Sequence, residues 1–159
     1  MQELMFKAKR FDNGEWVRSG SINTFLDNGI KSYYMPQYDE KCVCTHEELT
    51  DNILKFEECK FYKVAPSTLC QYTGFDDVNK KGIYRGDIIR TYDTTEDDDY
   101  IVDWDDKRGG FVICSTVTGQ KYEDLIGDVI ADLPATEVIG NIYDNPELLK
   151  EGIKDGQTS

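Results

Sequence analysis

The sequence predicts a mainly β protein, α+β at most, with an N-terminal hairpin, a small curled antiparallel sheet resembling an SH3-like barrel, and short helices. Short alternating apolar runs recur along the chain, and clusters of Asn, Asp and Gly separate them, as is typical of antiparallel strands joined by turns. Hydrophobic residues make up 39% of the 159 residues and aromatic residues 12%, which is too much apolar material for a disordered chain. We expect a single unit over residues 1–153, with a β-rich part at 1–65, a second part at 66–153, and a frayed tail at 154–159.

Two hairpins are predicted in the first 34 residues. Over residues 3–20, apolar and polar residues alternate, and the turn residues at 12–14 precede a second run that begins at Trp16. The Asn28-Gly29 pair then predicts a turn between the runs at 24–26 and 30–34. The pattern after residue 34 is less regular.

A short helix over residues 45–56 has one competing interpretation. Thr45 and Glu48 have the spacing of a capping box, and Leu49, Ile53 and Phe56 follow at helical spacing. The alternative is a run of strand and turn broken at residues 51–52, and the sequence leaves both open.

The clearest β pattern is a meander over residues 83–117. Its strands are expected at 83–92, 100–104 and 110–114, with turns at 97–99 and 105–110. Alternation places Asp103 on the face opposite Tyr100, Val102 and Trp104, which predicts one buried and one wet side. We expect this sheet to be joined by residues 138–143 and to pack on the first hairpin. The hairpin is expected to contact the sheet through Phe6 and Trp16. The sheet is expected to bury four apolar side chains in one cluster, namely Ile88, Val102, Phe111 and Ile113.

Two helices are predicted near the C-terminus. Leu125, Val129 and Leu133 recur at four-residue spacing, which predicts a helix over residues 121–133 that Pro134 ends. Asn145 followed by Pro146 has the chemistry of a helix start, and this last helix is expected to end near residue 152.

Charge and composition exclude several classes of protein. Asp and Glu total 31 against 18 Lys and Arg, so the net charge of -13 disfavours direct binding to nucleic-acid phosphates. No apolar run approaches the ~20 residues that span a bilayer, and the first residues lack a secretion signal, so we expect a cytoplasmic protein that does not bind membranes. Five cysteines with no paired framework indicate reduced thiols without disulfides.

Residues 69–89 carry a resemblance to a known family. The run LCQYTGFDDVNKKGIYRGDII resembles the central signature of the YopX family, and residues 5–9, 16–17 and 137–149 agree with it in order, whereas residues 35–60 match nothing in it. The resemblance implies a protein of bacteriophages and prophages in a bacterial host, with a mostly β fold and no assigned biochemical activity.

Glycines in this signature are interpreted as structural. Gly86 and Asp87 lack the pattern of a phosphate-binding loop, and a carboxylate would stand where an anion would bind. We expect Gly86 to permit a bulge or bend, Asp87 to accept hydrogen bonds from neighbouring backbone N–H groups, and Gly74 to supply a positive φ in a turn.

The sequence contains two clusters of residue types that can bind metal ions. Cys42, Cys44, His46 and Cys59 are competent zinc ligands, but their spacing matches no known finger, and buried thiols are the favoured alternative. The acidic run 96–99 with Asp103, Asp105 and Asp106 could hold Ca²⁺ or Mg²⁺, but it lacks the EF-hand register, which favours a solvated hairpin tip that guards a sheet edge.

The sequence favours a non-enzymatic module that binds an unidentified protein. No segment around His46 matches a catalytic signature, so we assign no catalytic, cofactor-binding or metal residues and expect no cofactor. Tyr84, Trp104 and Tyr143 are the candidate contact residues if they are exposed, with a place in the core as the alternative for each. Two further hypotheses remain: an acidic inhibitor that mimics nucleic acid through residues 93–106, and a metal-dependent enzyme. Formation of a homo-oligomer is left open.

Overall fold

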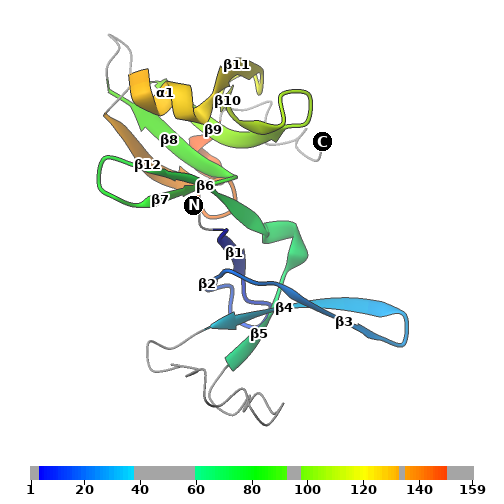
Figure 1. The fold of residues 1–159 in the computed structure, drawn as a ribbon. Helices are drawn as coiled ribbons and strands as arrows, with labels where there is room; N and C mark the ends of the chain where they lie inside the picture. The colour runs from blue at the N-terminus through cyan, green and yellow to red at the C-terminus, as the bar shows by residue number, and fades with distance from the viewer. Residues whose placement is uncertain (1–3, 38–59, 93–97, 133–134, 150–159) are drawn as a thin grey trace, which may run out of the picture. The chain divides into compact units, whose positions relative to one another are not determined.

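A computed structural model describes residues 4–37, 60–92, 98–132 and 135–149 of the chain (Figure 1). The chain divides into two compact units, an N-terminal unit, Glu3–Leu69, and a C-terminal unit, Cys70–Ser159 together with Met1–Gln2. The expectation of one unit with an internal boundary at residues 65–66 stays a prediction.

The N-terminal unit begins with the predicted hairpin. Strands β1 (Phe6–Lys9) and β2 (Trp16–Ser19) pair antiparallel, with Phe6 opposite Ser19 and Lys9 opposite Trp16. Gly14 has a φ of 73°, a conformation that glycine adopts without steric cost, so the turn residues at 12–14 act as expected.

A three-stranded antiparallel sheet follows in the order β3-β4-β5, formed by β3 (Asn23–Asp27), β4 (Ile30–Gln37) and β5 (Lys60–Val64). Asn28 and Gly29 have φ values of 48° and 78°, which is the type I′ geometry that matches the twist of a hairpin. The predicted turn between β3 and β4 is therefore confirmed. A 3-10 turn, η2 (Pro66–Thr68), comes after β5.

The core of the N-terminal unit lies between its hairpin and one face of its sheet. Ala8, Val17, Met35 and Val64 are buried in it, and Phe6 packs against them. A bridge between Arg10 and Val64 ties the end of the hairpin to β5. Phe6 thus serves this core, and packing of the hairpin on the second sheet stays a prediction.

The C-terminal unit is built around a five-stranded antiparallel sheet in the order β11-β10-β9-β8-β12. Its elements along the chain are β6 (Cys70–Asp76), β7 (Gly82–Tyr84), β8 (Asp87–Thr91), β9 (Asp98–Asp105), β10 (Gly110–Ser115), β11 (Lys121–Leu125), α1 (Ile126–Asp132), β12 (Thr136–Asn141) and the 3-10 turn η3 (Pro146–Leu148). The mainly β class and the meander joined by the last strand are confirmed. β11 and β12 are the two edges of this sheet, so the described strands form an open sheet and not a closed barrel.

Both faces of the five-stranded sheet bury apolar side chains, which corrects the expectation of one wet side. Val102, Phe111 and Ile113 lie in a cluster that α1 covers with Ile126 and Val129. Ile88 belongs to a separate cluster with Leu149, and Ile101 packs there too. Ile88 and Ile89 are adjacent in β8 and point to opposite faces, so Ile88 cannot share the first cluster.

Two helix predictions near the C-terminus are corrected. Residues 121–125 form β11, because they pair with the edge of β10 that β9 leaves open, and α1 begins only at Ile126. The last helix is a single 3-10 turn over Pro146–Leu148, after which Leu149 is extended and buried. In the described part of the chain, no helix has the length and apolar character needed to span a membrane.

Candidate functional site

One face of the β3-β4-β5 sheet packs into the N-terminal core, and the other displays apolar side chains. Tyr33 and Met35 of β4 point to the core, so Tyr34 between them points away from it. The same alternation places Ile30 and Pro36 of β4 on the face of Tyr34, with Phe61 of β5 opposite Pro36, which is itself buried. The Phe25 ring meets the Tyr34 ring edge to face at 5.3 Å. We call this surface the outer face; it consists of Phe25, Ile30, Tyr34 and Phe61, with Phe11 next to it.

Phe11 is held at the border of the outer face by two contacts to one residue. Its backbone N–H donates to the Lys63 carbonyl at 2.8 Å, and the Lys63 ammonium lies 5.0 Å from the centre of its ring. Phe11 and Ile30 are each 69% exposed, and Phe25 is 58% exposed. Monomeric proteins seldom expose this many neighbouring apolar groups unless the surface binds something.

The β3–β4 hairpin extends the outer face into an arm. In the described part of the chain, β5 pairs with residues from Tyr33 to Gln37, so residues 30–32 of β4 pair there with β3 alone. Leu26, on the opposite face of the arm from Phe25, is 75% exposed. Both faces of the arm therefore present apolar side chains to solvent.

The described residues of the N-terminal unit are mostly basic where they are charged, although the whole chain is acidic. The described residues 4–37 and 60–69 contain seven Lys and Arg against three Asp and Glu. Two of these three carboxylates, Asp12 and Glu15, form ion pairs with Arg10, whose guanidinium also lies 3.9 Å from the centre of the Tyr62 ring. Among the described residues of this unit, cationic side chains therefore outnumber carboxylates.

The three contact residues predicted from the sequence all lie in the C-terminal unit. Tyr84 is only 6% exposed and its ring packs 5.5 Å from that of Tyr72, which favours the core alternative for this residue. Trp104 is half-buried against Phe111, with ring centres 5.0 Å apart, and its indole N–H donates to Asp106. Tyr143 is also half-buried. Their part in binding stays a prediction.

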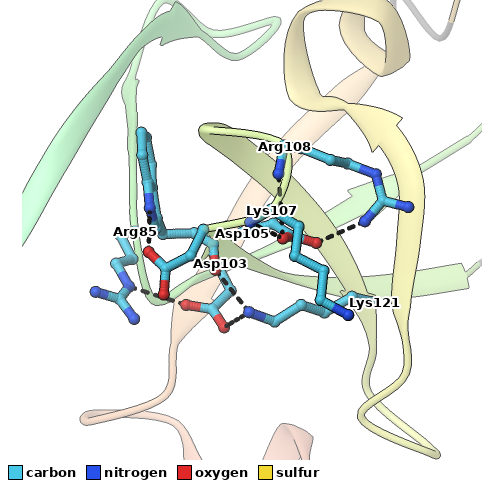
Figure 2. A network of polar contacts seen from close by, with 8 residues as sticks. Arg85, Asp103, Asp105, Lys107, Arg108 and Lys121 are labelled. Carbon is cyan, nitrogen blue, oxygen red and sulfur yellow. Dashed lines mark hydrogen bonds and ion pairs between the residues drawn. The ribbon is translucent and has the colours of Figure 1, made fainter.

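An ionic cluster joins β9 to its neighbours in the C-terminal unit (Figure 2). Asp103 accepts from Arg85 at 2.9 Å on one side and contacts the Lys121 ammonium at 3.1 Å on the other. Lys121 also donates to the Trp104 carbonyl at 2.6 Å. In the following turn, Asp105 accepts from the backbone N–H of Lys107 and from the Arg108 guanidinium. Each of these two carboxylates is bound by cations, so the cluster fastens strands and a turn.

Burial and these partners shift several pKa values. Burial raises the pKa of Asp103, but the Trp104 N–H, Lys121 and Arg85 lower it more, so this pKa lies below its usual range. Burial raises the pKa of Cys114 to about 11, and burial with the neighbouring Cys70 raises the pKa of Tyr143 to about 12. Asp103 is therefore held in its charged form, whereas Cys114 and Tyr143 are held in their neutral forms.

The glycines of the signature segment have structural roles; that of Gly86 was expected from the sequence, whereas that of Gly74 differs from the expectation. Gly86 has a φ of 86°, and it breaks the predicted strand 83–92 into β7 and β8. A Cβ on Gly86 would lie 3.4 Å from the Tyr143 ring. The Asp87 carboxylate accepts from the Tyr84 backbone N–H at 2.8 Å, as predicted. Gly74 has a φ of 90° inside β6, where the register to β7 shifts, so it forms a bulge and not a turn.

Asp77 fastens the turn between β6 and β7. One carboxylate oxygen accepts from the backbone N–H groups of Asn79 and Lys81, at 2.8 and 2.9 Å. The other accepts from the backbone N–H of Val138 in β12 at 3.0 Å. Asp77 of the signature segment therefore joins the β6–β7 hairpin to β12 through hydrogen bonds from backbone N–H groups.

A comparison with protein families shows that the family model described as YopX protein matches residues 6–150. The chain belongs to the YopX family. Its structure is similar to the crystal structure of protein EF1440 from Enterococcus faecalis, at 19% sequence identity and a TM-score of 0.50, covering 92% of this chain and 98% of that one. At that identity the similarity concerns the fold alone. A comparison with curated proteins found no match.

Several candidates considered in this YopX-family sequence lie outside the described residues. They are the helix at 45–56, the possible zinc ligands Cys42, Cys44, His46 and Cys59, and the acidic residues 96 and 97. Asp99, from the same acidic run, lies in β9 and forms a bidentate pair with Arg90 at 2.7 and 2.9 Å. Within the described ranges, no group of three or more His, Cys, Asp or Glu side chains is arranged to hold a metal ion. Cys70 and Cys114 are reduced and buried.

Sequence reasoning missed the outer face of this YopX-family protein. One signal was available: Phe25 and Leu26 are adjacent in a strand next to the Asn-Gly turn, so their side chains must point to opposite faces. A hairpin arm that is apolar on both faces can be covered on both, on one or on neither, and here both are exposed. Which of these applies depends on the length of β5, which the irregular pattern after residue 34 did not reveal.

Proposed function

We propose that this YopX-family chain is a non-enzymatic module of a phage or prophage that binds another protein in the bacterial cytoplasm through its outer face. The exposure of Phe25 and Ile30 on the outer face, and of Phe11 next to it, is the observation that carries the proposal. Burial of apolar surface is the main favourable term in protein association, at about 25 cal/mol per Å². Rigid aromatic rings add contact area at low entropic cost.

The ionic cluster supports a binding role over a catalytic one. A general acid or base must reach its substrate with a proton to accept or give. Asp103 and Asp105 are instead held by Arg85, Lys121 and Arg108, and their pKa values are lowered, so they are poor proton carriers near neutral pH. These carboxylates are suited to a structural role, in which their ion pairs stabilise the five-stranded sheet of the C-terminal unit.

The same pairing weakens the alternative of a nucleic-acid mimic. A mimic needs carboxylates that present unpaired charge to a basic enzyme. Asp99, Asp103 and Asp105, all within the acidic region 93–106, are paired with arginine or lysine in the structure.

The test is affinity purification from the bacterial cells in which the chain naturally occurs, with tagged wild-type protein and a Phe11→Ser/Ile30→Ser double variant. These residues lie at two borders of the outer face and are both exposed, so their loss should leave the fold intact. We expect a protein recovered in defined stoichiometry with the wild type and at least tenfold depleted with the double variant.

Val117→Ser is the matched control, since Val117 is 52% exposed but lies in the C-terminal unit. This variant should recover the partner as the wild type does. Equal recovery by the double variant, or recovery of nucleic acid in place of a protein, contradicts the proposed function.

A further inference from the structure

We propose that the outer edge of β3 pairs with β3 of a second copy of the chain, antiparallel about a two-fold axis at Phe25. The inference concerns the edge of the arm, and it does not rest on the protein partner proposed above. In the described sheet, β3 is an edge strand with β4 on one side only. Such an edge presents a row of backbone N–H and C=O groups that another strand can complete.

The β3 edge lacks the features that usually protect an edge strand. Natural edges carry lysine, proline or a bulge, each of which discourages pairing with another chain. β3 has the sequence NTFLD, without lysine or proline, and its register to β4 runs from Asn23 to Asp27 without a shift. Its central side chains, Phe25 and Leu26, are exposed on opposite faces, so an added strand would gain apolar contacts on both.

The sequence of β3 is complementary to itself in the antiparallel direction. Pairing centred on Phe25 sets the two Phe25 residues opposite each other, Thr24 opposite the second copy's Leu26, and Asn23 opposite the second copy's Asp27. Asp27 is the only charged residue of β3. In this register the two Asp27 residues are about 13 Å apart along the strands, beyond the screening length of ~8 Å at physiological salt. No like charges meet across the edge.

A second copy is the favoured occupant because every molecule presents the same edge, and closed two-fold contacts are the commonest mode of self-association. The paired strands would run in the order β5-β4-β3-β3-β4-β5, so the two outer faces would become one surface. A contact of five residues is smaller than the ~800 Å² per partner of a stable interface, so we expect a weak dimer. The net charge of -13 repels the copies, and salt should therefore strengthen the association.

The test is sedimentation equilibrium of the full chain at concentrations from roughly 10 µM to 1 mM, the range of weak interfaces. The average mass should rise from 18.3 kDa toward twice that value, and the rise should begin at a lower concentration in 0.5 M than in 0.05 M NaCl. Hydrogen exchange of the amides in residues 23–27 should slow as the concentration rises.

Phe25→Lys and Leu26→Lys place a charge on the edge and should keep the chain monomeric throughout, with unchanged circular dichroism. Ile30→Lys is the matched control, because Ile30 is equally exposed on the same arm but lies on β4; this variant should still dimerise. A wild type that stays monomeric at 1 mM overturns the inference, as does a dimer that persists in both β3 variants or one that only Ile30→Lys dissociates. Loss of the dimer with unchanged partner recovery in the affinity purification would leave the proposed function standing.

Discussion

Asp103 contributes to stability through its charge, and this contribution depends on pH. Its pKa is lowered in the folded protein, because the Trp104 N–H, Lys121 and Arg85 outweigh the opposing effect of burial. A group with a lowered folded pKa stabilises the protein above its unfolded pKa, near 3.8, and loses this contribution as the pH falls through the folded value. Acid should therefore unfold the protein in part by protonating this residue.

We predict that Asp103→Asn is less stable than the wild type at pH 7 and that the difference in melting temperature shrinks below about pH 4. The measurement is thermal unfolding by circular dichroism between pH 7 and pH 2.5. Asp106→Asn is the control, because Asp106 is exposed and takes no part in the ion pairs that Asp103 forms with Arg85 and Lys121. A constant difference across the whole range would show that the Asp103 charge has no such role.

Tyr143 has the opposite dependence at the alkaline end. Burial raises its pKa to about 12, so its neutral form is favoured in the folded protein. The resulting stability is fully present below pH 10 and is lost as the pH rises from 10 toward 12. Cys114 adds a similar loss that begins lower, since its pKa is raised to about 11 from 9.0.

Tyr143→Phe has no hydroxyl to ionise, so its stability should fall less than that of the wild type between pH 10 and 12. Urea unfolding at pH 8, 10 and 11 measures this, and the free-energy gap between the two proteins should move in favour of Phe as the pH rises. Parallel curves over this range would mean that the Tyr143 hydroxyl is solvated in the native protein.

At the scale of elements, the β6–β7 turn depends on one carboxylate. Asp77 accepts from three backbone N–H groups, those of Asn79, Lys81 and Val138, and its side chain is buried. Without Asp77 these donors lose their partner, and each buried orphan costs about 1–3 kcal/mol. The turn and the register of β12 should loosen together.

We predict that Asp77→Ala lowers the free energy of unfolding by about 1–3 kcal/mol, because the buried Val138 N–H loses its partner, while the neighbouring Asp76→Ala changes it by less than about 0.5 kcal/mol, since Asp76 is exposed. Urea denaturation of both variants gives the comparison. Equal effects of the two substitutions would contradict the role assigned to Asp77.

Local chemistry predicted the elements whose partners are close in the sequence. Gly14, the Asn28-Gly29 pair and Gly86 lie among residue types that favour turns or bends, so these features were predictable. The start of α1 was not predictable, because the helical spacing that begins at Leu125 does not show that residues 121–125 pair with β10. Ile88 was assigned to the wrong cluster because two adjacent isoleucines do not reveal which face each will bury.

At the scale of the molecule, net charge was a poor guide to local surfaces. The chain carries -13 overall, yet the described residues of the N-terminal unit have an excess of Lys and Arg. The candidate contact residues were chosen for being aromatic, and two of the three are half-buried while Tyr84 is buried. Phe11 and Phe25, which are more exposed than any of these three, lie instead on the N-terminal unit, because exposure depends on which strands pair beyond the hairpin and not on residue type.

The most direct test of the outer face is photo-crosslinking inside the native bacterial cells, with a benzophenone amino acid at position 11 or at position 117. Both positions are exposed, and only position 11 borders the outer face. The account predicts a discrete crosslinked product that contains a second protein species from position 11 and none from position 117. A discrete product from position 117 with none from position 11 would contradict it.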